Sequence, residues 1–168
     1  MNQKYKLGLR ALKTAISVLL CLLIAIIFHR SDMFFASIAA IICMQQTYDQ
    51  TYSAGIHRLI GTIIGGAIGL ASLLIIKYTP YNEYSDLIFA PLCILSVIYI
   101  CNVIEYKNSV VIGCIVALSV ILQHSELNAY TNTFMYVINR VIDTSIGIII
   151  AMLVNKFLFR KKSAVKPK

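Results

Sequence analysis

The chain has 168 residues, of which 59% are hydrophobic and 13% are charged, and its formal net charge is +8. Soluble domains are typically about 45–50% apolar and about 25% charged, so this composition excludes an ordinary soluble enzyme or binding module. The positive charge lies mainly at the two ends, beside apolar runs, where anionic lipid headgroups attract it. No soluble part remains to bind nucleic acid, and we expect one integral membrane domain over residues 1–168.

Six apolar stretches follow one another along the chain and are separated by polar links. A membrane-spanning helix needs about 20 mostly apolar residues, with a range of about 17–25. The first stretch is too long for the core of a signal peptide, so we interpret it as an uncleaved helix. The predicted spans are residues 11–28, 33–47, 59–76, 87–104, 110–122 and 141–159. The sequence therefore predicts an all-α membrane protein with six transmembrane helices.

The distribution of lysine and arginine predicts the orientation, because these residues concentrate on the cytoplasmic side of a membrane. With six spans, both termini lie on the same side. Placing the termini inside leaves twelve of the fifteen basic residues in the cytoplasm and only Arg30, Lys77 and Arg140 outside. We therefore expect a multi-pass protein with both termini cytoplasmic.

The third and sixth spans begin alike, with an arginine, a threonine and a glycine at the same spacing. The matching pairs are Arg58 with Arg140, Thr62 with Thr144, and Gly65 with Gly147. In each half of the chain, a long span is followed by a short span and then by another long span. Because each half has three spans, the second half crosses the membrane in the opposite direction to the first. The fold class that we predict is thus two inverted three-helix repeats, an arrangement that recurs in transporters.

The second and fifth spans are short, at about 12–13 residues, and short spans at matching positions point toward a transporter's binding site. An alternative is that these spans are tilted helices, or that they continue through residues 45–47 and 123–124. The third span also carries Gly61, Gly65 and Gly69 at four-residue intervals, and the sixth span carries Gly147. We predict that these glycines pack against another helix of this chain or of a second protomer.

Charged residues near the apolar interior are the candidates for function, because burying a charge in a membrane is costly. Arg58, Arg140 and Asp143 are those residues, and we find no other cation in the interior. The arginines stand at the starts of their spans, where they line a route for anions while Asp143 adjusts the charge. Alternatively, the arginines anchor at headgroups, and Asp143 neutralises Arg140 or caps its helix. The predicted substrate-binding residues are Arg58, Arg140, Asp143, Gln45, Thr62 and Thr144.

Catalytic and metal-binding motifs are missing from the sequence. It contains no G-x-S-x-G, H-E-x-x-H or P-loop pattern, and its five cysteines form no C-x-x-C pair. We expect no enzyme, no cofactor and no metal.

Gln45 follows a short span, where it either donates hydrogen bonds to a carboxylate or caps a helix end.

Four segments together resemble the bacterial aromatic acid exporter family, which is similar to fusaric acid resistance proteins. They are residues 8–15, 34–45, 54–62 and 140–147, and the resemblance covers about residues 6–159. It implies a six-helix plasma-membrane domain that exports organic anions as a homodimer. Many relatives continue into a cytoplasmic helical domain, whereas this chain stops at Lys168. Two alternatives remain open: a non-transporting scaffold or regulatory subunit, and a substrate-binding membrane subunit of an uptake system.

Overall fold

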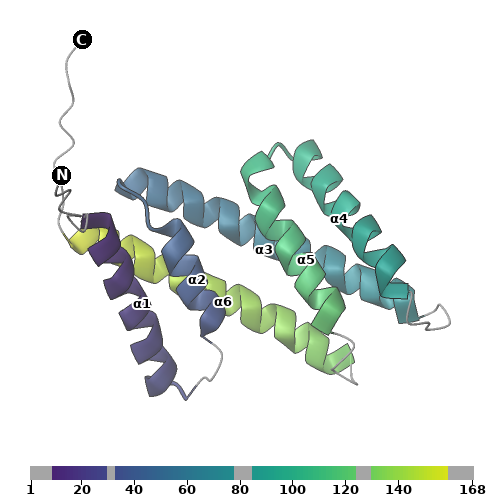
Figure 1. Ribbon diagram of the computed structural model, residues 1–168, viewed down its shortest axis with the longest axis horizontal. Coiled ribbons are helices and arrows are strands. Elements are labelled where there is room, and N and C mark those ends of the chain that lie inside the picture. The colour runs from purple at the N-terminus through teal and green to yellow at the C-terminus, as the bar shows by residue number, and fades with distance from the viewer. Residues whose placement is uncertain (1–8, 30–32, 78–84, 124–129, 159–168) are drawn as a thin grey trace, which may run out of the picture. The chain divides into compact units, whose positions relative to one another are not determined.

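The computed structural model describes residues 9–29, 33–77, 85–123 and 130–158; Arg30, His124 and the basic tail from residue 160 lie outside these residues. The described part of the chain is helical, which confirms the predicted all-α class (Figure 1). Its elements are α1 (Leu9–Ile27), α2 (Phe34–Cys43), α3 (Tyr48–Lys77), α4 (Ser85–Val103), the 3-10 turn η1 (Lys107–Ser109), α5 (Val110–Gln123) and α6 (Tyr130–Phe157).

Helix lengths follow the same order in the two halves of the chain. The first three helices have 19, 10 and 30 residues, and the last three have 19, 14 and 28. Among the residues that the structure describes, three helices contain segments long and apolar enough to cross a membrane, namely Arg10–Ile27, Tyr48–Ile75 and Thr133–Phe157. The apolar segments of α2, α4 and α5 are shorter. These helices indicate a multi-pass membrane protein.

Helix α2 ends earlier than the predicted span 33–47. It stops at Cys43, and Met44 has an extended backbone with φ −68° and ψ 105°. Ten residues rise about 15 Å, which is about half of a bilayer's hydrocarbon thickness. The expectation that this helix continues through residues 45–47 is therefore wrong. The segment between α2 and α3 leaves the helical conformation because the Gln45 backbone N–H donates to the Thr51 hydroxyl, at 3.1 Å, instead of continuing the helix.

Helices α3 and α6 begin earlier than hydropathy predicts, at Tyr48 and Tyr130 rather than at residues 59 and 141. At α3, the Thr47 hydroxyl accepts a hydrogen bond from the Gln50 backbone N–H, at 3.3 Å, which caps the helix start. Asp49 in the first turn also favours this start, because the helix dipole is positive there. Polar capping residues lower mean hydropathy but stabilise a helix, so hydropathy alone places the boundary too late.

Because of these early starts, Arg58 and Arg140 lie inside their helices and not at the helix starts. Each arginine comes ten residues after the first residue of its helix, since 58 − 48 = 10 and 140 − 130 = 10. Both helices begin with tyrosine, and both carry a buried threonine three residues later, Thr51 and Thr133. The common register thus extends well beyond the three matches read from the sequence.

The chain divides into two compact units. The first unit comprises residues 1–55 and 145–168, and the second unit comprises residues 56–144. In the first unit, α1 packs beside α2, and in the second unit α4 and α5 form a pair of adjacent helices joined through η1 (Figure 1). The core of that pair contains small and medium apolar side chains: Cys93, Val97 and Cys101 of α4, and Ala117 and Ile121 of α5.

Glycines make close helix contacts within each unit. In the second unit, a methyl group at Gly61 would lie 2.6 Å from the Ser109 carbonyl oxygen, and one at Gly65 would overlap the Gly113 carbonyl. In the first unit, a methyl group at Gly147 would overlap the Ala36 carbonyl. Small residues of this kind allow helix backbones to approach each other closely. Gly61, Gly65 and Gly69 of α3 therefore pack against η1 and α5, and Gly147 of α6 packs against α2, within this chain.

Candidate functional site

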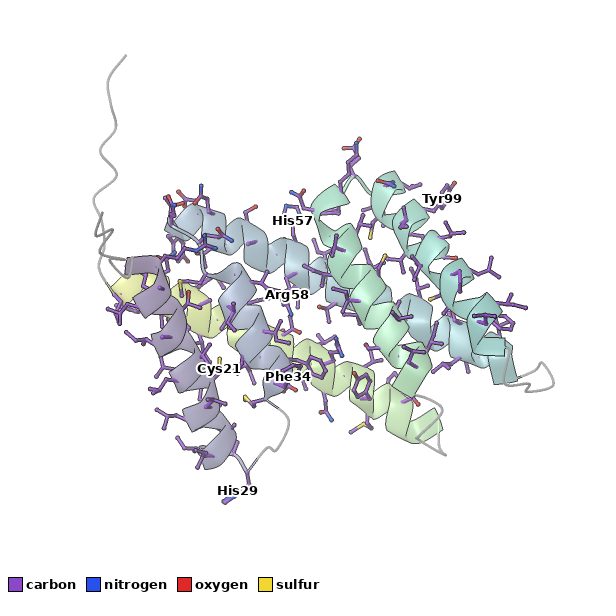
Figure 2. All side chains as sticks on the ribbon, in the orientation of Figure 1. Cys21, His29, Phe34, His57, Arg58 and Tyr99 are labelled. Atoms are coloured by element: carbon purple, nitrogen blue, oxygen red, sulfur yellow. The ribbon has the colours of Figure 1, made fainter. Side chains whose placement is uncertain are left out.

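The second unit buries two arginines, each followed by a threonine one helical turn later. Arg58 and Arg140 are 8% and 7% exposed, and Thr62 and Thr144 are almost fully buried. Figure 2 shows Arg58 on α3, next to His57. The Thr62 hydroxyl donates to the Arg58 carbonyl oxygen at 2.9 Å, so its oxygen keeps the capacity to accept a further hydrogen bond.

Asp143 lies in the same unit and is 3% exposed. The structure thus places five of the six predicted substrate-binding residues in the second unit, and all five are buried. Two guanidinium groups and one carboxylate give these buried residues a net positive charge. A buried environment with excess positive charge favours an anion over a cation or a neutral solute.

Tyr136 positions Arg140 from one turn earlier on α6. The Arg140 Nη1 donates to the Tyr136 hydroxyl oxygen at 2.6 Å, and the guanidinium carbon lies 5.8 Å from the centre of the tyrosine ring. A guanidinium at this distance is attracted by an aromatic face. Tyr136 is half-buried and is a functional candidate that is not among the substrate-binding residues predicted from the sequence.

Gln45 is the predicted residue that lies in the first unit instead. Its side-chain Nε2 donates to the Ile42 carbonyl oxygen at 3.1 Å, at the end of α2. The side chain thus makes the helix-capping contact that was one of the two readings of this residue.

The first unit contains a buried polar cluster that sequence reasoning missed. Lys13 is 7% exposed, and its ammonium donates to the Oδ1 atom of Asn155 at 2.7 Å. The Asn155 Nδ2 in turn donates to the Thr51 hydroxyl at 2.7 Å, and to the carbonyl oxygens of Thr47 and Gln45 at 3.0 and 3.2 Å. We call Lys13, Asn155 and Thr51 the Lys13 cluster. It joins α1, the link after α2, α3 and α6.

This cluster corrects the expectation that the arginines are the only cations in the interior. Lys13 lies at the start of the predicted span 11–28 and was counted with the twelve cytoplasmic basic residues, yet it is buried on one face of α1. A signal was present in the sequence: Lys13, Ser17 and Cys21 recur every four residues, and all three are buried on one face of α1. Asn155 carried a second signal, because it is a polar residue within the apolar sixth span.

A second polar contact, also missed, joins α3 to the start of α5. The Ser109 hydroxyl and the His57 Nδ1 are 3.5 Å apart, and the rings of His57 and Tyr106 meet edge to face at 5.8 Å. Because Ser109 also lies against Gly61, this contact fixes η1 on α3 one turn from Arg58. We assign it a positioning role for the start of α5.

Within the described residues, no three His, Cys, Asp or Glu side chains group in a way that could hold a metal ion. The five cysteines are free thiols, and Cys21, Cys43, Cys93 and Cys101 are buried among apolar side chains. They act as small core residues.

Comparison with known proteins assigns the family. The model of the family described as aromatic acid exporter family member 1 matches residues 5–158, which is nearly the whole chain. No curated protein and no solved structure matches significantly. The matched range agrees closely with residues 6–159, over which the sequence motifs resemble this family. The chain therefore belongs to the aromatic acid exporter family.

Proposed function

We propose that the protein exports aromatic or other organic acid anions across the bacterial plasma membrane. One observation carries this proposal beyond family membership: the charge of the buried residues. Among the described residues, Lys13, Arg58 and Arg140 are buried cations, and Asp143 is the buried carboxylate. Three positive charges against one negative charge suit the passage of anions, because unbalanced buried charge in a membrane protein usually serves a substrate or ion route.

The architecture that we propose for transport is a pair of inverted repeats with six membrane crossings. Matching helix lengths and the common register of α3 and α6 support it. The glycine contacts add a further correspondence: Gly65 meets the carbonyl of Gly113 on α5, and Gly147 meets the carbonyl of Ala36 on α2. In each case the third helix of one half packs against the short middle helix of the other half. Short middle helices at matching positions are the feature that points to a transporter's binding site.

We further propose that both termini are cytoplasmic, as the distribution of basic residues predicts, and that two chains assemble as a homodimer, as the family resemblance implies. A scaffold that binds a partner through the glycine face is less well supported, because the α3 glycines already pack within the chain. A substrate-binding uptake subunit predicts a tightly bound ligand that copurifies with the protein. A purified protein that carries such a ligand and shows no flux would favour that alternative.

Anion flux in proteoliposomes tests the proposal. We expect radiolabelled benzoate to cross vesicles that contain the protein faster than it crosses empty vesicles. Arg58→Ala and Arg140→Ala should each reduce this flux at least about tenfold, the effect of losing one charge-assisted hydrogen bond.

Lys107→Ala is the matched control, because Lys107 is an exposed cation of the same unit. It should leave the flux within about twofold of wild type, as expected of a solvated surface charge. Flux equal to that of empty vesicles, or wild-type flux in both arginine variants, would refute the proposed route.

A further inference from the structure

Lys13 differs from an ordinary basic flanking residue in having a buried ammonium group. Of its three N–H donors, one is directed at Asn155 Oδ1, at 2.7 Å. Asn155 is the one hydrogen-bond partner of this ammonium among the described residues, and no carboxylate there neutralises it. Placing a cation in such surroundings is costly, so residues of this kind commonly serve a ligand.

The partner of Lys13 is itself held in one orientation. The Asn155 Nδ2 faces three oxygen atoms, those of Gln45, Thr47 and Thr51, so its Oδ1 must face the ammonium. The Thr51 hydroxyl is also engaged on both sides, because it donates to the Thr47 carbonyl and accepts from the Gln45 N–H. The Lys13 cluster is therefore preorganised, and its remaining donors belong to the ammonium.

A second cation lies beside the cluster. Arg10 is three residues before Lys13 on α1, and its Nε donates to the Met44 carbonyl oxygen at 3.1 Å. Arg10 is exposed whereas Lys13 is buried, so positive charge continues from the surface of the first unit to its interior. Such an arrangement attracts anions toward the buried group.

The positions of the second unit that match Asn155 and Lys13 are apolar. The spacing of 82 residues that relates Arg58 to Arg140 also relates Thr51 to Thr133, and it relates Leu73 to Asn155. Leu73 is buried in a cluster with Val120 and Val137, against which Phe89 packs. Phe89 is the fifth residue of α4, as Lys13 is the fifth residue of α1. The cationic cluster is thus built into one unit and not into its counterpart.

We propose that Lys13 binds the carboxylate group of the aromatic acid substrate, with Asn155 as its positioning residue. In the orientation given above, this places an anion-loading site at the cytoplasmic ends of α1 and α6. The inference rests on the proposed function for the identity of its ligand. It adds to that function a substrate-binding residue and the side on which export begins.

Ligand-induced thermal stabilisation of the purified full-length protein tests the site without measuring transport. We expect benzoate to raise the melting temperature saturably, whereas its uncharged analogue benzamide should not. Lys13→Met should raise the apparent Kd for benzoate about 10- to 100-fold, as loss of a charge-assisted hydrogen bond predicts. Lys13→Arg, which keeps the charge, should stay within a few-fold of wild type.

Two further variants keep the test decisive. Asn155→Asp places a carboxylate against Lys13, and the resulting internal ion pair should abolish benzoate binding even if Lys13→Met does not fold. Lys156→Met removes an exposed cation from the next position of α6 and should bind benzoate like wild type.

The outcomes separate this inference from the proposed function. Benzoate stabilisation that is absent in wild type, or unchanged in Lys13→Met and Asn155→Asp, overturns the site even if vesicles transport benzoate. Stabilisation by inorganic phosphate but not by benzoate also overturns it, and assigns Lys13 to lipid headgroups. Lys13-dependent benzoate binding in a protein that gives no flux would support the site and refute the exporter.

Discussion

Gly65 of α3 lies against Gly113 of α5, so close that a methyl group at Gly65 would overlap the Gly113 carbonyl group. Backbone atoms cannot move aside as the end of a flexible side chain can. The separation of these two helices is therefore determined by the absence of side chains at this point. In the same helix, His57 and Arg58 lie two turns earlier, so the packing of Gly65 also fixes where the buried arginine is held.

Gly65→Ala should therefore destabilise the second unit. Overpacking a tight contact costs about 1–3 kcal/mol, and we expect a lower melting temperature of the purified protein. Ala67→Leu is the control, because Ala67 is exposed on the same helix and the change adds more volume there. Equal melting temperatures for Gly65→Ala and wild type would show that this contact does not set the helix separation.

Gly147→Ala should have a comparable effect in the first unit, where the methyl group would overlap the Ala36 carbonyl and lie 2.7 Å from the Ala39 Cβ. Adding Ala39→Gly removes only the second of these contacts. The double variant should therefore remain less stable than Ala39→Gly alone, since the carbonyl stays in place. A melting temperature of the double variant equal to that of Ala39→Gly alone would contradict the backbone contact.

The threonines at matching positions offer a direct comparison. Thr51→Val removes a hydroxyl that bonds to Gln45 and Asn155, and leaving buried polar groups unpaired costs about 1–3 kcal/mol each. Thr133→Val is the control, because the Thr133 Oγ1 is buried without a hydrogen-bond partner among the described residues. We expect a lower melting temperature for the first variant and an unchanged or higher one for the second. The opposite order would contradict the hydrogen-bond network.

Tyr136→Phe should weaken benzoate transport by a few-fold, less than Arg140→Ala. The change removes the hydroxyl that accepts from Arg140 at 2.6 Å but keeps the aromatic ring beside the guanidinium. The KM for flux in proteoliposomes is the quantity to measure. Tyr99→Phe, at an exposed tyrosine of α4 (Figure 2), should not change it. Similar KM values for the Tyr99 and Tyr136 variants would remove Tyr136 from the site.

Cysteine labelling tests the orientation. We expect His29→Cys to react with a membrane-impermeant maleimide in intact cells, and Glu105→Cys to react only after permeabilisation. Both positions are exposed ends of helical segments, whereas four of the five native cysteines are buried, so the unmodified protein supplies a low background. The reverse labelling pattern would place the termini outside and reverse the direction inferred for Lys13.

The sequence predicted most accurately those properties that depend on a single continuous segment of the chain. The apolar runs predicted helices, and the motifs around residues 54–62 and 140–147 predicted the family. Helices α3 and α6 begin before the predicted spans 59–76 and 141–159, and at α3 the reason is that polar residues at the helix start lower hydropathy while they stabilise the helix. Arg58 and Arg140 were recognised as charged residues near the apolar interior, but their position ten residues into each helix follows only from the observed helix starts at Tyr48 and Tyr130.

The sequence by itself determined the class of protein, the helical content, the family and the excess of positive charge, because composition and local periodicity express these directly. The tertiary structure decided which cations are buried, since the face of a helix that turns inward depends on the helices packed against it. Lys13 shows this difference: its position beside a lipid-facing run suggests a headgroup anchor, yet its bond to Asn155 joins residues 142 positions apart. Only folding brings those two side chains together, and so only the structure revealed the cationic cluster.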